Sequence, residues 1–175
     1  YFQGNYSDGV AFWKSDGTTN GTVMFAGNHA PEMTNTGNPV FNPINQDIPA
    51  ANNAGTLVKD MLASLISTGG SFTDFDLGAL QGIAIVGVNN TSGVWQYSVN
   101  NGSTWLPIQT GSNDPKMLAA DNTTRIRYQP NPGTTGTVGI TFHPRDRTAF
   151  ANGGNGFLNT GRNFTMSTTT ENAYL

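Results

Sequence analysis

The chain lacks cysteine and has few charged residues. Its 175 residues include 8 Lys and Arg, 11 Asp and Glu and 2 His, so that only 11% are charged. The absence of cysteine excludes disulfides and thiol chemistry and leaves the redox compartment open. A net charge of -3 and a pI near 5.1 argue against nucleic acid as a partner, because phosphate binding needs a basic patch.

Long hydrophobic runs are also missing. No run of about 18 apolar residues occurs, so the sequence predicts no membrane insertion. No charged and then apolar leader opens the chain. Residues 1–4 read YFQG, which resembles the end of a tobacco etch virus protease recognition sequence, and we interpret them as an expression-tag remnant.

Motifs for catalysis are absent as well. His29 and His143 lie far apart and do not form a two-histidine zinc motif, and the chain has no nucleophile elbow and no phosphate-binding glycine loop with lysine. A glycosidase would need Asp74 and Asp76 to flank a bound sugar, which two carboxylates so close in sequence seldom do. The sequence therefore predicts that the protein is not an enzyme.

The residues that are abundant indicate a β-rich domain with many turns. There are 22 Gly and 9 Pro, and Asn and Thr are frequent. A chain of this length buries about 70% of its unfolded surface in one core. Apolar and polar residues alternate over several segments, and Asn101-Gly102 favours the positive φ of a hairpin turn. Strands are expected at 10–14, 23–26, 83–88, 94–99, 104–108, 125–128, 138–142 and 164–175. Such alternation predicts antiparallel sheets with one buried and one solvated face.

One segment has helical rather than strand periodicity. Apolar residues recur at helical spacing between Leu57 and Leu65, and Gly69-Gly70 ends the pattern. This predicts one short helix near 55–66 that covers an open end of the sheets. Residues 40–41 are expected to form a short edge strand.

The basic residues are predicted to be ordinary surface groups. Arg125, Arg127, Arg145 and Arg147 are expected to be solvated, and His143 falls on the polar phase of its strand. The glycine- and asparagine-rich loop 147–162 is too long for a simple connection. We expect its two aromatic residues, Phe150 and Phe157, to hold it against the body.

Three aspartates form the candidate metal site. Asp74 and Asp76 alternate on an extended segment, and Asp146 follows a predicted strand. Because Ca²⁺ takes several oxygen ligands, these three residues are candidate ligands. The alternative is that they cap turns and bind local backbone amides.

Three aromatic residues form the candidate ligand-binding set. Trp95 and Tyr97 share a strand face, and Trp105 is placed across the hairpin. Exposed in a row they would stack on a carbohydrate, whereas core packing is the alternative use for the tryptophans.

A series of blocks along the chain resembles a known family. The blocks are NHAP (28–31), NAGTLV (53–58), FTDFDLGALQGIAIVGV (72–88), VWQYSVNNGSTW (94–105), MLAADNTTRIRYQPN (117–131) and TFHPRDRT (141–148). Their order resembles a cadherin-like, immunoglobulin-type tandem β-sandwich module of large bacterial surface or secreted repeat proteins. The resemblance implies an all-β, antiparallel Greek-key sandwich, often adhesive and often stabilised by Ca²⁺. At position 29 the chain has His where the family linker usually has Asp.

These observations give a domain organisation and a functional hypothesis. Residues 5–30 are expected to form an N-terminal hairpin or the tail of a preceding repeat with a linker, and 31–175 the sandwich. The resemblance implies a non-catalytic structural or adhesive module, extracellular or on the bacterial surface. Its partners would be neighbouring modules of the same chain and a cell-surface glycan or protein. The alternative is a carbohydrate- or peptide-binding module that uses the exposed aromatics and loop 147–162.

Overall fold

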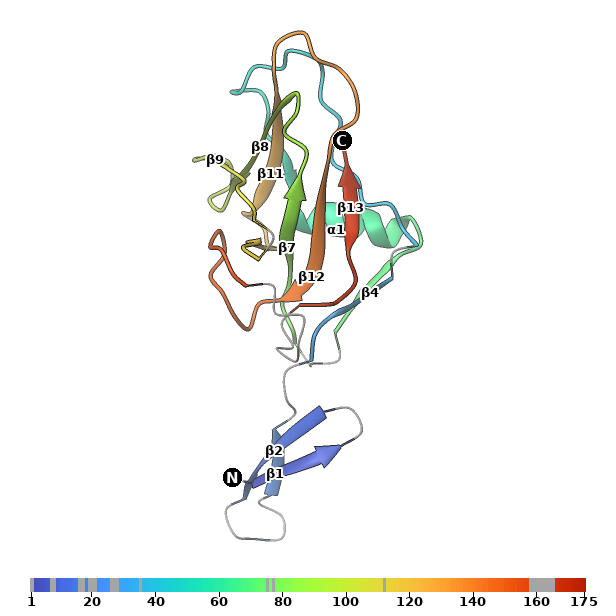
Figure 1. Cartoon of the computed structure of the whole chain (residues 1–175), viewed down its shortest axis with the longest axis vertical. Helices are drawn as coiled ribbons and strands as arrows, with labels where there is room; N and C mark the ends of the chain where they lie inside the picture. The colour runs from blue at the N-terminus through green and yellow to red at the C-terminus, as the bar shows by residue number, and fades with distance from the viewer. Residues whose placement is uncertain are drawn as a thin grey trace.

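The computed structural model describes most of the chain. The described residues are 2–6, 9–15, 18, 22–25, 29–34, 36–74, 76, 78–111, 113–157 and 166–175. Within them the regular structure is antiparallel β-sheet apart from one short helix, as the composition predicts (Figure 1).

Two four-stranded antiparallel sheets form the main body. The first sheet has the order β10-β7-β12-β13, made of Lys116–Ala119, Gln81–Val88, Gly139–Asp146 and Glu171–Tyr174. The second has the order β5-β11-β8-β9, made of Thr56–Leu57, Arg125–Pro130, Gly93–Ser98 and Leu106–Pro107. Buried side chains from both sheets belong to one apolar cluster, which is the arrangement of a β-sandwich.

Two smaller sheets accompany this body. β4 (Glu32–Thr34) pairs with β6 (Ser71–Thr73). At the N-terminus β1 (Phe2–Tyr6), β2 (Gly9–Ser15) and β3 (Thr22–Phe25) form a three-stranded antiparallel sheet. The antiparallel pairing of β2 with β3 agrees with the hairpin expected at 10–14 and 23–26, of which residue 26 lies outside the described residues. The assignment of 5–30 to the tail of a preceding repeat stays a prediction. Residues 2–4 lie in β1, and their origin as a tag remnant stays a prediction.

The apolar core is centred on the indole of Trp95, which is completely buried. Its ring centroid lies 4.9 Å from that of Phe41 and 5.2 Å from that of Tyr128. Tilted aromatic pairs at these separations stabilise a core beyond simple area burial. The two sheets contribute further core residues: Ile83, Ile85, Leu118, Ile140, Phe142 and Ala173 from the first, and Tyr97 and Ile126 from the second.

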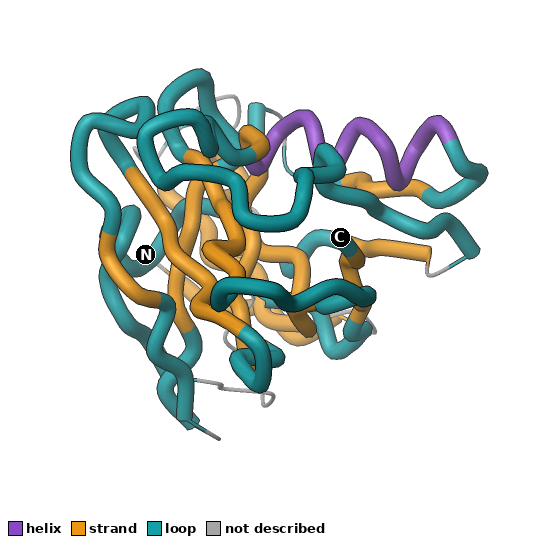
Figure 2. The backbone as a smooth tube through the Cα atoms, turned by 90° about the horizontal axis from the view of Figure 1, so that it is seen from above, coloured by secondary structure: helices purple, strands orange, loops and turns teal. Residues whose placement is uncertain are grey.

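The single helix, α1, covers the core from one side. It spans Val58–Ser67, close to the predicted 55–66, and buries Val58, Met61, Leu62 and Leu65. Figure 2 shows it lying to one side of the strands. Its C-terminus ends as predicted at the glycine pair, where Gly69 has φ +98° and the Gly70 amide donates to the Leu65 carbonyl at 3.0 Å.

The turn after β8 also agrees with the sequence. Asn101 and Gly102 have φ values of 57° and 86°, in the left-handed region that Asn-Gly favours. The Ser98 hydroxyl accepts a hydrogen bond from the Gly102 amide at 2.9 Å, which fixes the turn to the end of its strand.

The first sheet differs from the prediction because both of its faces are covered. Ala84 lies between two core residues of β7 and so faces the opposite side, yet it is fully buried with Met117 and Met166. On that same side His143 is 7% exposed and Arg145 is 2% exposed. The expectation of a solvated outer face is wrong here because residues 147–157 and 166–169 fold over it.

The buried polar groups on that face bind backbone carbonyls. His143 Nδ1 lies 3.0 Å from the carbonyls of Ser167 and Thr169. Arg145 Nε donates to the Asp146 carbonyl at 2.7 Å, and its Nη2 donates to the Ala149 and Phe150 carbonyls. The prediction that His143 and Arg145 are surface residues is therefore wrong, because they satisfy loop carbonyls that have no strand partner.

The two edges of the first sheet are paired with non-strand segments. We call residues 151–157 the edge segment; it lies along β10, where Gly153 N donates to Met117 O and Met117 N to Gly154 O, at 2.8 and 2.9 Å. Phe150 and Phe157 are 39% and 73% exposed, so the prediction that they anchor this loop is wrong, and backbone pairing does so instead. Residues 158–162 of the predicted loop lie outside the described residues.

The opposite edge is paired by the segment expected to be an edge strand. Val40 forms a parallel bridge with Tyr174 of β13. Phe41 N donates to Tyr174 O at 3.0 Å, and Tyr174 N donates to Pro39 O at 3.3 Å. We call these two hydrogen bonds the parallel clamp. Covered edges of this kind protect a sheet from adding a foreign strand.

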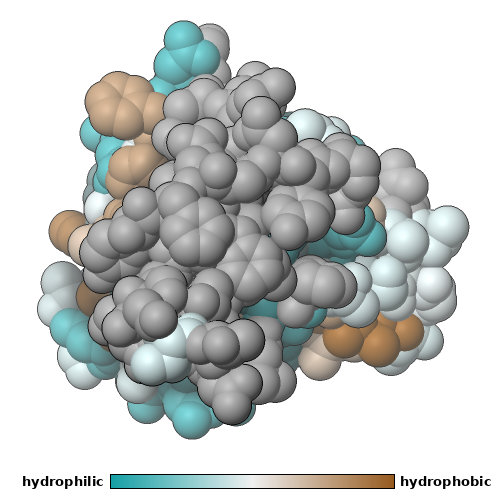
Figure 3. Space-filling model, turned by 90° about the horizontal axis from the view of Figure 1, so that it is seen from below, coloured by the Kyte–Doolittle hydropathy of each residue, from teal (hydrophilic) through white to brown (hydrophobic). Residues whose placement is uncertain are grey.

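Where Figure 3 shows described residues, hydrophilic and hydrophobic atoms both reach the surface, and the hydrophobic ones lie in separate groups. None of the described helical residues forms a helix of the length and apolarity needed to cross a membrane. The exposed large apolar residues are Val40, Ile66, Leu80, Val94, Val99, Leu106, Phe150, Phe157 and Tyr174.

Two adjacent helix residues test the position of the core. Leu65 is fully buried and Ile66 is 53% exposed. We expect Leu65→Ala to lower the free energy of unfolding by about 2–5 kcal/mol, because it leaves a cavity. The matched Ile66→Ala should cost about 0.5 kcal/mol or less. Urea unfolding of both variants measures this, and equal losses would contradict the burial of α1.

Candidate functional sites at the two ends of the sandwich

The first candidate site lies where the chain enters the sandwich. His29 binds Asp76 twice, with its backbone amide donating to Oδ2 at 2.7 Å and its ring Nδ1 lying 2.9 Å from Oδ1. Asp74 Oδ1 accepts the Asp76 amide at 2.8 Å, which is an Asx-type turn. Asp146 ends β12, is 1% exposed, and accepts the Thr148 amide and hydroxyl through Oδ1. We call these four residues, His29 and the three aspartates, the acidic cluster.

Within the acidic cluster, the pKa values of Asp74 and Asp76 are shifted in opposite directions. Burial raises the pKa of Asp74, and repulsion from Asp76 and Asp146 raises it further against the hydrogen bond from the Asp76 amide. Burial also acts to raise the pKa of Asp76, but the hydrogen bonds and charge of His29 outweigh it, so that this pKa is lowered. The structure thus joins Asp74 and Asp76 by a hydrogen bond, whereas Asp146 acts on Asp74 through its charge.

The cluster does not fit a preformed calcium site. Both carboxylate oxygens of Asp76 already accept from His29, and one oxygen each of Asp74 and Asp146 accepts a local amide. Among the described residues there is no group of three His, Cys, Asp or Glu arranged to hold a metal ion. The turn-capping alternative accounts for the observed hydrogen bonds of Asp74 and Asp146.

Neutralising the two neighbouring aspartates should have opposite effects. Asp74→Asn keeps the acceptor for the Asp76 amide but removes a repelled charge, so at pH 7 we expect a gain of about 0.5 kcal/mol in unfolding free energy. Asp76→Asn removes a charge that His29 stabilises and should cost a similar amount, about 0.5 kcal/mol.

The pH dependence distinguishes the two variants. The gain from Asp74→Asn should vanish as pH falls through the raised pKa of Asp74, where the wild-type carboxyl is itself neutral. The loss from Asp76→Asn should persist to lower pH and vanish only through the lowered pKa of Asp76. Urea unfolding across the acidic range measures both, and effects of equal sign at pH 7 would contradict the assignment.

The three candidate ligand-binding aromatics do not form an exposed row. Trp95 is fully buried and Tyr97 is 7% exposed, with its hydroxyl donating to the Gly153 carbonyl at 3.0 Å. Trp105 is half-buried under the guanidinium of Arg127, which lies 4.1 Å from its ring centroid. The prediction of a stacking platform is wrong because the alternation of β8 directs Trp95 and Tyr97 into the core.

Arg127 differs from its predicted role as a solvated strand residue. It is 8% exposed, and its Nη1 donates to the carbonyls of Ala50 and Asn53 at 2.9 and 3.2 Å. Its Nε donates to Gln96 Oε1 at 2.7 Å. Stacking on Trp105 completes its surroundings, so this cation anchors the loop before β5 to the second sheet.

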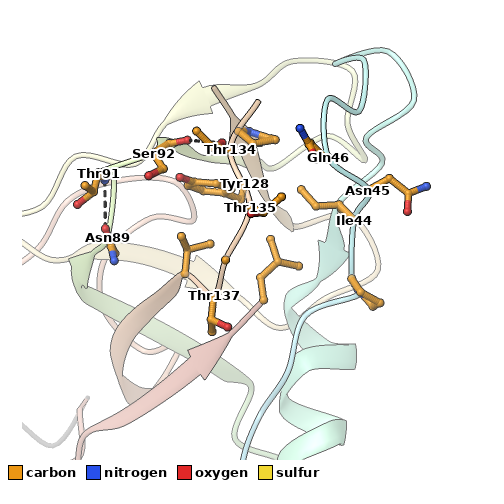
Figure 4. A pocket seen from close by; sticks show the side chains of 15 residues that line it. Ile44, Asn45, Gln46, Asn89, Thr91, Ser92, Tyr128, Thr134, Thr135 and Thr137 are labelled. Carbon is orange, nitrogen blue, oxygen red and sulfur yellow. Dashed lines mark hydrogen bonds between the residues drawn. The ribbon is translucent and has the colours of Figure 1, made fainter. Parts of the chain in front are cut away.

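The second candidate site is a pocket at the other end of β12, beside Leu175. We call it the end pocket; its volume is about 490 Å³. Figure 4 shows Tyr128 in its middle, with Ile44, Asn45 and Gln46 on one side and Asn89, Thr91 and Ser92 on the other. The full lining is Pro43, Ile44, Asn45, Gln46, Asn89, Thr91, Ser92, Tyr128, Pro130, Thr134, Thr135, Gly136, Thr137, Val138 and Leu175.

The side chains that line the end pocket are uncharged. Its lining has hydroxyl and amide groups and no Asp, Glu, Lys, Arg or His. Burial raises the pKa of the Tyr128 hydroxyl, with the Ser92 backbone acting in the opposite direction. Such a lining offers hydrogen bonds without charge, and its volume lies in the range of small-molecule sites. Sequence patterns do not reveal it, because its residues come from three separate loops, from β11 and from Leu175.

The chain was compared with known proteins in three ways. A scan against protein-family models and searches of curated proteins and of solved structures returned no match. The resemblance to a cadherin-like or immunoglobulin-type module therefore stays a prediction.

Proposed function

We propose that this chain is a non-catalytic structural module of the cadherin-like or immunoglobulin-type class, one unit of a serial array outside a bacterial cell. The observation that carries the proposal is the placement of its connections. The chain enters the sandwich at His29, and β13 ends at the opposite end of β12, beside the end pocket (Figure 1). A unit connected in this way transmits tension along its strands.

The parallel clamp supports a mechanical role. Residues 39–41 and β13 run in the same direction, and two hydrogen bonds join them. Tension applied at His29 and at Leu175 pulls these two segments in opposite directions along their length. Their hydrogen bonds are then loaded in shear together rather than opened one by one.

The covered edges are consistent with a crowded array. The β10 edge is paired with the edge segment and the β13 edge with residues 39–41. The outer strands of the second sheet, β5 and β9, have only two residues each. Neighbouring modules can therefore stand side by side without exchanging strands. In this proposal the partners are adjacent modules of the same chain, with adhesion to a cell-surface glycan or protein supplied by the array.

Stretching single molecules by their ends tests this function. Tyr174→Pro removes the amide that donates to Pro39, and we expect it to lower the unfolding force clearly. Asn172→Pro is the matched control, because within the described part of the chain the Asn172 amide donates to the side chain of Glu171 beside it and not to residues 39–41. Equal unfolding forces for the two variants, or a wild-type chain that extends without a discrete force peak, would contradict the proposal.

The end pocket supports a second candidate function, the binding of a neutral saccharide. Hydroxyl and amide groups around the partly apolar floor of Ile44, Val138 and Leu175 suit a ligand with many hydroxyls and no charge. This replaces the predicted site on exposed aromatics, which the burial of Trp95 excludes.

A glycan array tests this second function. If the pocket binds a saccharide, Thr135→Arg should abolish the signal, because it places a long cation at the pocket wall. Thr170→Arg adds the same charge at an exposed position away from the pocket lining and should leave the signal unchanged. Absence of any neutral glycan from the bound set would contradict this candidate and agree with a pure spacer.

A further inference from the structure

Where β10 meets the edge segment, a lysine contacts an asparagine, and the same asparagine contacts an aspartate that precedes β10. Lys116 Nζ contacts Asn155 Oδ1, and Asn155 Nδ2 donates to Asp114 Oδ2 at 2.6 Å. This pairing fixes the orientation of the amide, since the cation must face its oxygen and the carboxylate its nitrogen. The amide of Asn155 is therefore held between an amine and a carboxylate.

The amine is held in a partly apolar position. Lys116 is 8% exposed and pairs with Ile85 in the register of the first sheet, so its side chain leaves β10 on the same side as the core residue Leu118. Its Nζ lies 5.1 Å from the ring centroid of Tyr97, which belongs to the other sheet. A second hydrogen bond, to the Gly153 carbonyl at 3.2 Å, fixes the amine at the gap between the sheets.

We infer that Lys116 and Asn155 form an intramolecular isopeptide bond, with Asp114 as the catalytic residue that transfers the protons. This inference goes beyond the proposed function and does not rest on it. Because Oδ1 is bonded to Cγ, an amine in contact with Oδ1 lies within reach of the carbon that it would attack. Proximity of this kind replaces a bimolecular encounter between amine and amide.

The reaction balances without an oxidant or a further reactant. The lone pair of the neutral Lys116 Nζ forms a bond to Asn155 Cγ while the carbonyl electron pair moves to Oδ1. The attacking nitrogen is then bonded to the same carbon as Nδ2, which Asp114 Oδ2 contacts, and it loses a proton to Asp114. Asp114 then donates a proton to Nδ2, the bond from Cγ to Nδ2 breaks, and the carbonyl forms again as ammonia leaves. One amine and one primary amide become one secondary amide and one ammonia. The exposed position of Asn155 gives the ammonia a path to solvent.

The electrostatics of the site agree with this chemistry. Burial lowers the pKa of Lys116, against the opposing charge of Asp114, which increases the fraction of neutral amine. Asp114 already accepts a hydrogen bond from the nitrogen that must leave. A general acid within hydrogen-bond reach of its proton acceptor meets the geometric requirement for catalysis.

A second lysine–asparagine pair in the chain serves as a matched control. Lys59 Nζ donates to Asn122 Oδ1 at 2.5 Å, but this pair is exposed. Among the described residues, the Asn122 amide nitrogen has no hydrogen bond to a carboxylate. The Lys59–Asn122 pair therefore has the same two reacting groups but lacks a buried amine and a carboxylate to transfer protons. We expect no isopeptide bond between these two residues.

Mass spectrometry of the intact, denatured chain tests the inference. The wild-type chain should be lighter than its sequence by the mass of one ammonia, and a protease digest should contain one branched peptide that joins Lys116 to Asn155. Lys116→Arg should restore the full mass, because a guanidinium is a poor nucleophile, whereas Lys59→Arg should still lose ammonia. Asp114→Asn should convert much more slowly than the wild type.

The controls also exclude a different source of the mass loss. Asn-Gly sequences such as Asn101-Gly102 lose ammonia when the glycine nitrogen attacks the asparagine side chain, which gives the same intact mass. That loss would survive in Lys116→Arg and give no branched peptide.

A full-mass wild-type chain, or a loss that persists in Lys116→Arg, would overturn the inference. Conversion of Asp114→Asn at the wild-type rate would overturn the role of the carboxylate. The wild-type digest decides the question even if a variant does not fold.

Discussion

The structure depends on the packing of Trp95 between the two sheets. Its ring is enclosed by Tyr128 of the neighbouring strand and by Phe41 of the segment that precedes α1. Phe41 also donates its backbone amide to β13. One aromatic contact thus joins the second sheet, the first sheet and the parallel clamp. Any displacement of the indole would reach the parallel clamp as well as the core.

Buried cations hold the loops that surround this core. Arg127 binds the loop before β5, Arg145 binds the loop after β12, and Lys116 binds the edge segment. Each is almost fully buried, and each donates to backbone carbonyls outside regular strands. Carbonyls in a covered loop lose water and need donors, and long basic side chains reach them across a sheet. These three cations therefore have a structural role.

Local patterns predicted the local features. The spacing from Val58 to Leu65 identified α1, and Asn101-Gly102 identified the turn. The outer face of the first sheet was missed, because its alternation is the same whether a loop or water covers it. The contact of Lys116 with Asn155 spans 39 positions and has no local signal. The acidic cluster was found as a group, but the engagement of Asp76 by His29 depends on where the chain enters the sandwich.

The last strand has a consequence for the biosynthesis of this protein. β13 forms one edge of the first sheet and pairs with residues 39–41, which are made more than a hundred positions earlier. Until β13 leaves the ribosome, β12 lacks its outer neighbour and Phe41 lacks its backbone partner. Non-local pairing of this kind is slow to form. A nascent chain therefore has an open sheet edge during this interval, when it is most prone to aggregate.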